Sequence, residues 1–512
     1  MSFFITTAID YTNGAPHIGH AYEKVLADAI ARYQRLKGAD VFFLTGVDQH
    51  GQKVQQSAQK QGVAPADFVA GLTGKFLDLW KKLDISYDAW AATTEPVHKE
   101  CVQGMLQLLW DTGHFYKARQ TGYYSVRQEQ FLTDKERGPD GEFGAEWGEV
   151  VLIEEENYYF KLAAHRQWLL DLIDARTAAG TPFVVPDFRV AELRNAVEKL
   201  SGDLCISRPK SRLEWGIELP FDKDFVTYVW FDALSNYVSF AGYDPTPGAD
   251  NSLFHSRWPA LHVIGKDILV PPHGIYWPIM LKACGFADSD IPRLLVHGWW
   301  NIGGAKMSKS VGNIVDPAVL VETFGVAATR YYLLSDIATG RDSDFNEERL
   351  IQRYNGDLAN SLGNLLNRTL SMAKRYRSGL LKKADSPLAA LVAEKCADYL
   401  RHMEAFEIHA AIESTWEIIV RCNAYVEESA PWKLAKDPGA ADKLDEVLYS
   451  LSEALRIISL LITPIIPEPA DAIRAQLAWN GPVSLDQCEW GGLADGHQLG
   501  EPTPVFPRIE HE

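Results

Sequence analysis

The sequence predicts an α/β fold: a doubly wound, Rossmann-type parallel sheet, divided by an inserted unit and followed by an α-helical bundle. Three observations lead to this prediction. Short apolar, β-rich runs alternate with helical patterns over about the first hundred residues, as in parallel α/β sheets. A more irregular segment at 115–224 follows, after which strand-like runs resume. Beyond about residue 346 the pattern changes to long amphipathic helices, which favour a bundle.

The chain has 512 residues, a length for which roughly three domains are expected. We expect the sheet domain to be split in two by the insertion, and the bundle to be followed by a tail that packs back on the body. The expected segments are 1–114 and 225–300 (the two halves of the sheet domain), 115–224 (a connective insertion), 301–345 (a loop region), 346–475 (the bundle) and 476–512 (the tail).

The first half begins with an apolar run at 3–9, which suits a buried parallel strand. A turn cluster follows, and Pro16 suits the first turn of a helix. The helix is indicated by apolar residues at helical spacing, and Gly38 is a plausible stop. These apolar residues are Ile18, Tyr22, Val25, Ala29 and Tyr33. A second strand is predicted at 40–46.

Strand-like runs resume after the insertion and would complete the doubly wound sheet. They lie at 225–231, 260–264 and 293–297. The bundle is predicted from four long amphipathic patterns. These patterns lie at 349–376, 388–405, 408–428 and 441–463.

Composition is that of an ordinary globular protein, with 46% hydrophobic and 23% charged residues. The six cysteines are scattered without a Cys-x-x-Cys pair, which argues for reduced thiols in a cytoplasmic protein and against a cysteine-based zinc site. We expect no signal peptide, and the apolar run at 457–466 is too short to cross a membrane. A net charge of −18 alone weighs against nucleic-acid binding, although basic residues at 374–383 could form a local cationic face.

Two histidines, His17 and His20, stand three residues apart at the predicted start of the first helix. There they would lie at the positive end of the helix dipole, above the carboxyl end of a strand. Open α/β sheets bind anions and nucleotides at this position. Taken alone, the pair could equally be surface histidines or half of a metal site, but no other ligand cluster stands nearby in the sequence.

A second motif places two lysines, Lys306 and Lys309, in a stretch flanked by glycines at 301–313. The glycines predict a loop, and the lysines can reach phosphate oxygens as point charges. A solvated charged loop would explain a lone Lys-x-x-Lys. The full string Lys-Met-Ser-Lys-Ser at 306–310 is more specific, and its pairing with His-Ile-Gly-His is very unlikely to arise by chance.

These two strings resemble the signatures of class I aminoacyl-tRNA synthetases. The finer similarity is to the methionyl-tRNA synthetase family, and it extends through nearly the whole chain. It is carried by TTAIDYTNGAPHIGH at 6–20, LTGVDQHG at 44–51, YVWFDALSNY at 228–237, IGKDI at 264–268, VHG at 296–298 and ESAPW at 428–432.

The resemblance implies a cytoplasmic methionine–tRNA ligase that uses ATP with Mg²⁺. Such an enzyme forms methionyl-adenylate, releases pyrophosphate, and transfers the methionyl group to the 3′-terminal adenosine of methionine tRNA. Charge builds on phosphate oxygens during this reaction, so cationic and hydrogen-bonding groups suffice and no covalent nucleophile is needed. The implied catalytic residues are His17, His20, Lys306 and Lys309. The implied ATP-binding residues are Gly19, Glu23, Gly265, Asp267, His297, Gly298 and Lys309.

A methionine pocket must hold an ammonium group and an unbranched thioether. Asp48 is placed to pair with the ammonium, aromatic walls suit sulfur, and a tyrosine hydroxyl can hydrogen-bond the thioether. Without the resemblance, Asp48 could be a turn residue and Trp230 and Tyr237 core residues. His273 follows a segment one residue longer than the family pattern. The implied pocket residues are Ala8, Ile9, Tyr11, Asp48, Trp230, Ala233, Leu234, Tyr237 and His273.

For tRNA, the resemblance maps Asn364, Arg368 and Trp432 onto the positions that read the CAU anticodon. Asn364 and Arg368 lie four residues apart on one helix face. Splayed bases are read by hydrogen bonds to their edges and by stacking, which suits Asn, Arg and Trp. The alternative for Trp432 is a helix-cap contact, because Pro431 precedes it.

The sequence also departs from the family in ways that bear on cofactors and assembly. Where many relatives carry a Cys-x-x-Cys zinc knuckle, this chain reads GYYSVRQE at 122–129, so no structural zinc is expected. It ends without the extra tRNA-binding module of some relatives, so we expect a monomer. Two other hypotheses are a class I synthetase for another amino acid, which a short insertion disfavours, and a non-catalytic RNA-binding paralogue, which would not need both signatures.

Overall fold

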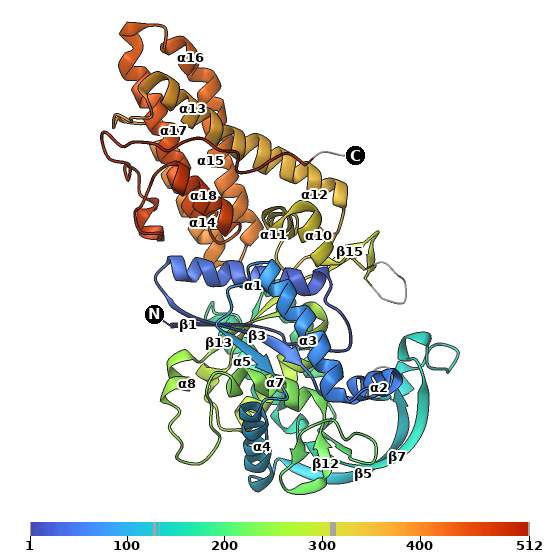
Figure 1. The fold of residues 1–512 in the computed structure, drawn as a ribbon. Helices are drawn as coiled ribbons and strands as arrows, with labels where there is room; N and C mark the ends of the chain where they lie inside the picture. The colour runs from blue at the N-terminus through green and yellow to red at the C-terminus, as the bar shows by residue number, and fades with distance from the viewer. Residues whose placement is uncertain (1, 126–129, 133, 308–313, 510–512) are drawn as a thin grey trace.

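A computed structural model of the chain describes residues 2–125, 130–132, 134–307 and 314–509 (Figure 1). Its centre is a parallel sheet in the order β4-β3-β1-β13-β14-β8, with the short β2 also paired to β3. The strands are β1 (Ser2–Thr7), β2 (Asp10–Tyr11), β3 (Asp40–Asp48), β4 (Ala89–Ala92), β8 (Val184–Val185), β13 (Ala260–Gly265) and β14 (Arg293–His297). The predicted doubly wound α/β fold is confirmed.

Helix α1 (Ile18–Leu36) follows the first strand as predicted, and its apolar stripe is buried. Pro16, however, is not part of the helix: His17 is the N-cap, with an extended backbone, and Ile18 is the first helical residue. Further helices of the first half connect and cover its strands. They are α2 (Gln52–Gln61), α3 (Pro65–Lys82) and α4 (Pro96–Asp111).

The insertion at 115–224 contains two small antiparallel sheets, which Figure 1 shows at the end of the molecule far from the bundle. One has the order β6-β5-β7-β9 and comprises Gln130–Leu132, Phe115–Ser125, Val150–Phe160 and Leu204–Cys205. The other has the order β10-β12-β11 and comprises Ser207–Pro209, Asp222–Thr227 and Glu218–Leu219. Along the chain, α5 (Arg166–Ala178), β8 and α6 (Val190–Glu198) lie between β7 and β9, and β8 joins the central sheet.

The predicted strand at 225–231 is wrong as a member of the parallel sheet. Its first residues belong to β12, which pairs only with the antiparallel strands β10 and β11. The rest begins helix α7 (Val229–Ser239). A short apolar and aromatic run fits either element, and here the spacing of Trp230, Leu234 and Tyr237 is that of one helix face.

Beyond the second half of the sheet, a short linking region leads into the helical bundle. The link comprises β15 (Trp300–Ile302), β16 (Ala305–Lys306), α10 (Pro317–Phe324), α11 (Val326–Ser335) and β17 (Ser343–Asp344), whereas α9 (Trp277–Ala283) lies between β13 and β14. The bundle comprises α12 (Glu347–Arg353), a π-helical turn (Tyr354–Gly363), α13 (Asn364–Arg377), α14 (Ala389–Glu404), α15 (Ile408–Ser429), α16 (Pro431–Leu434), α17 (Ala441–Leu461) and α18 (Pro467–Gln476). The four predicted helical ranges are confirmed to within a few residues.

The bundle and the sheet domain share one hydrophobic core. Helix α1 lies between the sheet and the bundle in Figure 1, and buried residues continue from α1 through α11 into the bundle helices. After α18 the chain returns along the bundle, where Leu493, Leu499 and Phe506 are buried. All six cysteines are free thiols. Among the described residues, every helix is too short or too polar to cross a membrane.

Candidate active site

The candidate site begins at the N-terminus of α1, where His17 and His20 lie one turn apart. The main-chain N–H of Gly19 donates to Nδ1 of His17 at 3.1 Å, and that of His17 donates to Nδ1 of His20 at 3.1 Å. Because Nδ1 accepts in both rings, each neutral imidazole carries its proton on Nε2. Both histidines therefore offer an Nε2–H donor at the positive end of the helix.

Gly19 is required by the packing of these two rings. Their centroids are 3.9 Å apart, and a Cβ at Gly19 would lie 2.9 Å from Cε1 of His17. That distance is too short for a carbon–carbon contact, so a side chain here would displace the His17 ring. Gly19 thus permits the close packing of the His17 and His20 rings that orients their Nε2–H groups.

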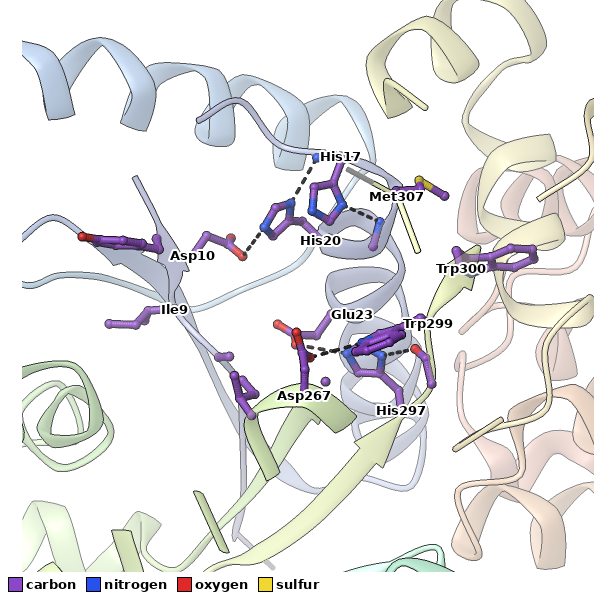
Figure 2. A pocket seen from close by; sticks show the side chains of 16 residues that line it. Ile9, Asp10, His17, His20, Glu23, Asp267, His297, Trp299, Trp300 and Met307 are labelled. Atoms are coloured by element: carbon purple, nitrogen blue, oxygen red, sulfur yellow. Dashed lines mark hydrogen bonds and ion pairs between the residues drawn. The ribbon is translucent and has the colours of Figure 1, made fainter. Parts of the chain in front are cut away.

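Both histidines line a cavity at the carboxyl edge of the central sheet (Figure 2). The cavity lies between β1 and β13, where the strand order changes direction, as in other doubly wound nucleotide-binding sheets. Six of the residues implied for ATP line it: Gly19, Glu23, Gly265, Asp267, His297 and Gly298. The seventh, Lys309, lies outside the described residues. Sequence reasoning missed five further lining residues: Asp10, Ile268, Trp299, Trp300 and Met307.

Gly298 follows β14 at a point where two segments touch. A Cβ at this position would lie 1.9 Å from the carbonyl oxygen of Arg341, so only glycine allows the contact. Next to it, the indole Nε1 of Trp299 donates to Oδ1 of Asp267 at 3.2 Å. The main-chain N–H of Trp299 also donates to Asp342 at 2.9 Å. These contacts fix the end of β14 to the segment that precedes the bundle.

A second cavity adjoins the first, and Ala8, Ile9, Tyr11 and Ile268 line both. All nine residues implied for methionine line this second cavity: Ala8, Ile9, Tyr11, Asp48, Trp230, Ala233, Leu234, Tyr237 and His273. Four of them recur on one face of α7, and Asp48 is buried at the end of β3. Lys53, Tyr228 and Ile268 also line it and were not expected from the sequence.

His273 reaches this cavity although one extra residue precedes it. The segment Leu269–Tyr276 has π-helical hydrogen bonding, and such a wide turn accommodates an additional residue. Nε2 of His273 lies 2.8 Å from the hydroxyl of Tyr237, and Nδ1 lies 3.0 Å from the carbonyl oxygen of Ile268. A carbonyl only accepts, so Nδ1 carries the proton and the Tyr237 hydroxyl donates to Nε2.

Behind Tyr237 lies His262, and both nitrogens of its ring are hydrogen-bonded. His262 stacks on the Tyr237 ring with centroids 4.0 Å apart. Nε2 of His262 accepts from the indole N–H of Trp277 at 3.0 Å, so its Nδ1 donates to Thr6 Oγ1 at 2.7 Å. Burial lowers the pKa of His273 to about 4, and burial together with His273 lowers that of His262 well below its usual range. Both imidazoles are therefore neutral at pH 7.

A buried carboxylate, Asp232, anchors α7 against the rest of the sheet domain. Its two oxygens lie 2.7 Å from Nδ1 of His50 and 2.8 Å from Nε2 of His98. The pKa of Asp232 is lowered to about 2, because these two histidines outweigh the effect of burial. His50 lies two residues after Asp48, the last residue of β3, so Asp232 couples the helix that carries Trp230 to the end of the strand that carries Asp48.

The remaining residues implied for function lie in the loop and the bundle. Lys306 ends β16, and only its backbone is described. Asn364 and Arg368 both lie on α13, and Trp432 is the second residue of α16, inside the helix and not at its cap. The Arg368 guanidinium is 5.8 Å from the centroid of the Trp432 ring and donates to Glu427 at 2.7 Å. The structure thus brings Arg368 and Trp432 together on one surface.

The described residues contain no group of three or more His, Cys, Asp or Glu side chains arranged to hold a metal ion. Part of the stretch aligned with the zinc knuckle, 126–129, lies outside the described residues. The carboxylate of Asp267 at the first cavity is an oxygen ligand of the type that Mg²⁺ accepts beside phosphate groups.

Two family models cover most of the chain. One, described as "tRNA synthetases class I (M)", matches residues 3–141 and 147–370. The other, described as "Anticodon binding domain of methionyl tRNA ligase", matches residues 377–512.

Curated relatives and solved structures agree with these matches. A methionine–tRNA ligase of Deinococcus radiodurans is 42% identical over 520 residues, which cover 99% of this chain and 74% of the relative. One of Bacillus subtilis is 39% identical over 539 residues, which cover 100% and 78%. A structure of the Mycobacterium tuberculosis methionyl-tRNA synthetase in complex with methionyl-adenylate superimposes with a TM-score of 0.92 at 38% identity, covering 99% of this chain and 100% of that one.

Proposed function

Because the chain belongs to the methionyl-tRNA synthetase family, and is therefore a methionine–tRNA ligase, we propose a role for each group that lines its two cavities. The observation that carries the proposal is their shared wall. It places an aromatic pocket containing one buried carboxylate directly beside a cavity lined by two aimed imidazole donors. A carboxylate bound in the second cavity can thereby meet the α-phosphate of a nucleotide bound in the first.

In the second cavity, Asp48 pairs with the substrate ammonium group, which leaves the substrate carboxylate free to point toward the first cavity. Trp230 and Tyr237 enclose the thioether between aromatic faces, which are favourable surroundings for sulfur. The backbone around Ala8 and Ile9 separates the amino acid from the nucleotide. This arrangement fixes the attacking oxygen near phosphorus and supplies much of the rate by orientation.

In the first cavity, the Nε2–H groups of His17 and His20 donate to phosphate oxygens as the α-phosphate is attacked. Lys306 and Lys309 supply positive charge to the departing pyrophosphate. Magnesium ions accompany ATP in this family and neutralise phosphate charge when bound. Glu23, Asp267, His297 and the glycines at 19, 265 and 298 hold the nucleotide. All of these donors act most strongly as charge develops, which is the condition for lowering the barrier.

The bundle supplies tRNA recognition. We propose that Trp432 stacks on a base of the CAU anticodon while Arg368 and Asn364 contact base edges or the backbone. The opposite charges of Arg368 and Glu427 keep the guanidinium close to the Trp432 ring. We further propose a cytoplasmic monomer that contains no structural zinc.

The test is amino-acid-dependent exchange of pyrophosphate into ATP, measured with each of the twenty amino acids. Methionine alone should support rapid exchange, since aromatic walls such as those at Tyr237 and Trp230 suit an unbranched thioether. Exchange with a different amino acid would assign the chain another specificity, and the absence of exchange would leave it a tRNA-binding protein. Lys309→Ala should reduce the exchange rate much more than it reduces methionine affinity in a binding assay.

A further inference from the structure

A lysine with no exposed surface lies beneath the nucleotide cavity. The ammonium of Lys24 donates to Oδ1 of Asp10 at 2.5 Å, to Oε1 of Glu23 at 2.9 Å and to the carbonyl oxygen of Ala8 at 3.1 Å. An ammonium has three N–H donors, so these three acceptors satisfy it completely. Lys24 therefore ties Ala8, which lines both cavities, to Glu23 and Asp10, which line the nucleotide cavity.

The charge pattern continues through the second oxygen of Glu23. Its Oε2 lies 3.1 Å from Nε2 of His297, while Nδ1 of His297 lies 2.7 Å from the carbonyl oxygen of Gly298. Both ring nitrogens of His297 thus face acceptor oxygens, and the ring lies between Glu23 and the end of β14. Glu23 therefore contacts Lys24 through one oxygen and His297 through the other, and Asp10 shares the Lys24 ammonium with Glu23.

These contacts matter because the four side chains that make them are buried: Asp10, Glu23, Lys24 and His297. Burial alone would raise the pKa of Glu23, but Lys24 and His297 outweigh it and lower that pKa. The pKa of Asp10 is raised to about 7 by burial, with a further contribution from Glu23, against the attraction of Lys24. If the cation at position 24 were removed, two neighbouring carboxylates would face each other without a shared counterion, which raises the pKa of both.

Asp10 also faces the cavity directly, as Figure 2 shows. Its Oδ1 lies 4.0 Å from Nε2 of His20, and its Oδ2 has no hydrogen-bond partner among the described residues. The other charged or titratable groups on this cavity are His17 from the start of α1 and Asp267, which follows β13. A buried carboxylate in this position is costly, so Lys24 is needed to keep it in place beside His20.

We propose that Lys24 and Asp10 are positioning residues for adenylate formation: as a buried, interacting pair they orient the Glu23 carboxylate at the nucleotide cavity and fix the Ala8 carbonyl between the two substrates. This inference rests on the proposed function, because it assigns the pair to the step in which methionine reacts with ATP.

The test compares three variants of the full chain, Lys24→Met, Asp10→Asn and the double variant, in methionine-dependent pyrophosphate exchange at one pH. Lys24→Met should lower kcat by about tenfold or more and change the KM for methionine much less, because Glu23 and the Ala8 carbonyl lose the donor that orients them. Asp10→Asn should lower kcat by a smaller factor, because Lys24 keeps its contacts with Glu23 and Ala8. The double variant removes one charge of each sign from the buried cluster, and its kcat should recover part of the loss seen in Lys24→Met.

A matched control is Lys82→Met, which breaks an exposed ion pair with Glu322 at 2.6 Å, remote from both cavities. Its kcat and KM values should match those of the wild type. A merely structural role would lower the melting temperature of Lys24→Met and leave kcat per folded molecule unchanged, and the double variant would then be no more active than Lys24→Met; either result overturns the proposal. Should Lys24→Met fail to fold, Asp10→Asn decides, and an unchanged kcat contradicts the inference. Absence of exchange in the wild type would instead refute the proposed function.

Discussion

A guanidinium nitrogen of Arg330 lies 2.6 Å from the carboxylate of Asp28, and neither side chain has any exposed surface. The same guanidinium donates to the carbonyl oxygen of Ile465 at 2.8 Å and to that of Leu83 at 3.0 Å. Asp28 belongs to α1, Leu83 ends α3, and Ile465 lies in the turn between α17 and α18. One buried side chain therefore fastens the helix that starts at His17 to the bundle.

Arg330→Met should destabilise the enzyme strongly. The substitution retains the aliphatic part of the side chain but removes the buried donor that joins Asp28 to carbonyl groups of the bundle turn and of the end of α3, while Arg32 and Ser86 still donate to Asp28. Breaking a buried pair from one side costs about 3–5 kcal/mol, so the free energy of unfolding in urea should fall by about that amount. Arg421→Met, which removes a partly exposed ion pair with Glu428, is the control and should cost less than about 1 kcal/mol. Similar small losses in both would contradict the anchoring role.

The neutral state of His273 predicts a specific pH dependence of stability. The unfolded chain protonates this histidine near its ordinary pKa of 6.5, whereas the folded chain keeps it neutral down to about pH 4. The free energy of unfolding should therefore fall as the pH drops from about 6.5 to 4, by up to about 3 kcal/mol from this residue. His273→Gln should flatten that slope in denaturation curves at several pH values, with part remaining because of His262. An identical slope in both proteins would show that His273 is charged when folded.

Tyr237→Phe should raise the KM for methionine by about tenfold and leave the KM for ATP nearly unchanged. Loss of the hydroxyl leaves Nε2 of His273 buried without a donor, which costs about 1–3 kcal/mol at a wall of the methionine cavity. Pyrophosphate exchange with each substrate varied in turn measures both constants. Ser256→Ala, at an exposed hydroxyl remote from both cavities, provides the control. A parallel rise in both KM values would place the effect on the fold as a whole.

Trp432→Ala should separate the two halves of the reaction. Stacking of a base on an aromatic ring contributes about 1–3 kcal/mol, so kcat/KM for tRNA should fall by about tenfold to a hundredfold while pyrophosphate exchange is preserved. Arg368→Ala should act similarly, with a loss that high salt partly masks. Exchange, aminoacylation and melting temperature should be measured on one preparation. Exchange and transfer falling together would mean that Trp432 serves the core of the bundle.

The purified enzyme should contain no stoichiometric zinc, and chelators should leave its melting temperature unchanged. The reason is chemical: the sequence lacks the paired thiolates with which structural zinc sites in this family are built. Elemental analysis of a sample purified without chelator gives the answer. About one zinc per chain would require ligands other than cysteine pairs and would overturn the expectation.

The sequence predicted those parts of the fold that local periodicity determines. The helices at 389–404, 408–429 and 441–461 have long amphipathic patterns, and the strands at 2–7, 40–48 and 260–265 are short apolar runs beside turn residues. The prediction of a strand at 225–231 was wrong because an apolar, aromatic run of that length fits either a strand or a helix. The pairing of Val184–Val185 with β14 is long-range, so no local pattern could have indicated it.

In the site, too, local motifs could be predicted from the sequence, whereas contacts between distant segments could not. Residues inside the two signatures and their neighbouring motifs could be placed by resemblance, and the structure gathers them around two cavities. Lys24 was not among the residues predicted for the site, and it is completely buried. Its partner Asp10 belongs to a different element, and a charged side chain is expected to be exposed unless a partner is known. Asp232 was missed for the same reason, since His50 and His98 come from two other segments.

The wall that both cavities share, formed by Ala8, Ile9, Tyr11 and Ile268, has a thermodynamic consequence. Any displacement of this backbone when one substrate binds alters the surface offered to the other, so the two occupancies are heterotropically linked. Linkage is reciprocal: the factor by which methionine changes the dissociation constant of ATP must equal the factor by which ATP changes that of methionine. Two titrations, each with and without a non-reactive analogue of the other substrate, would give this single coupling constant twice.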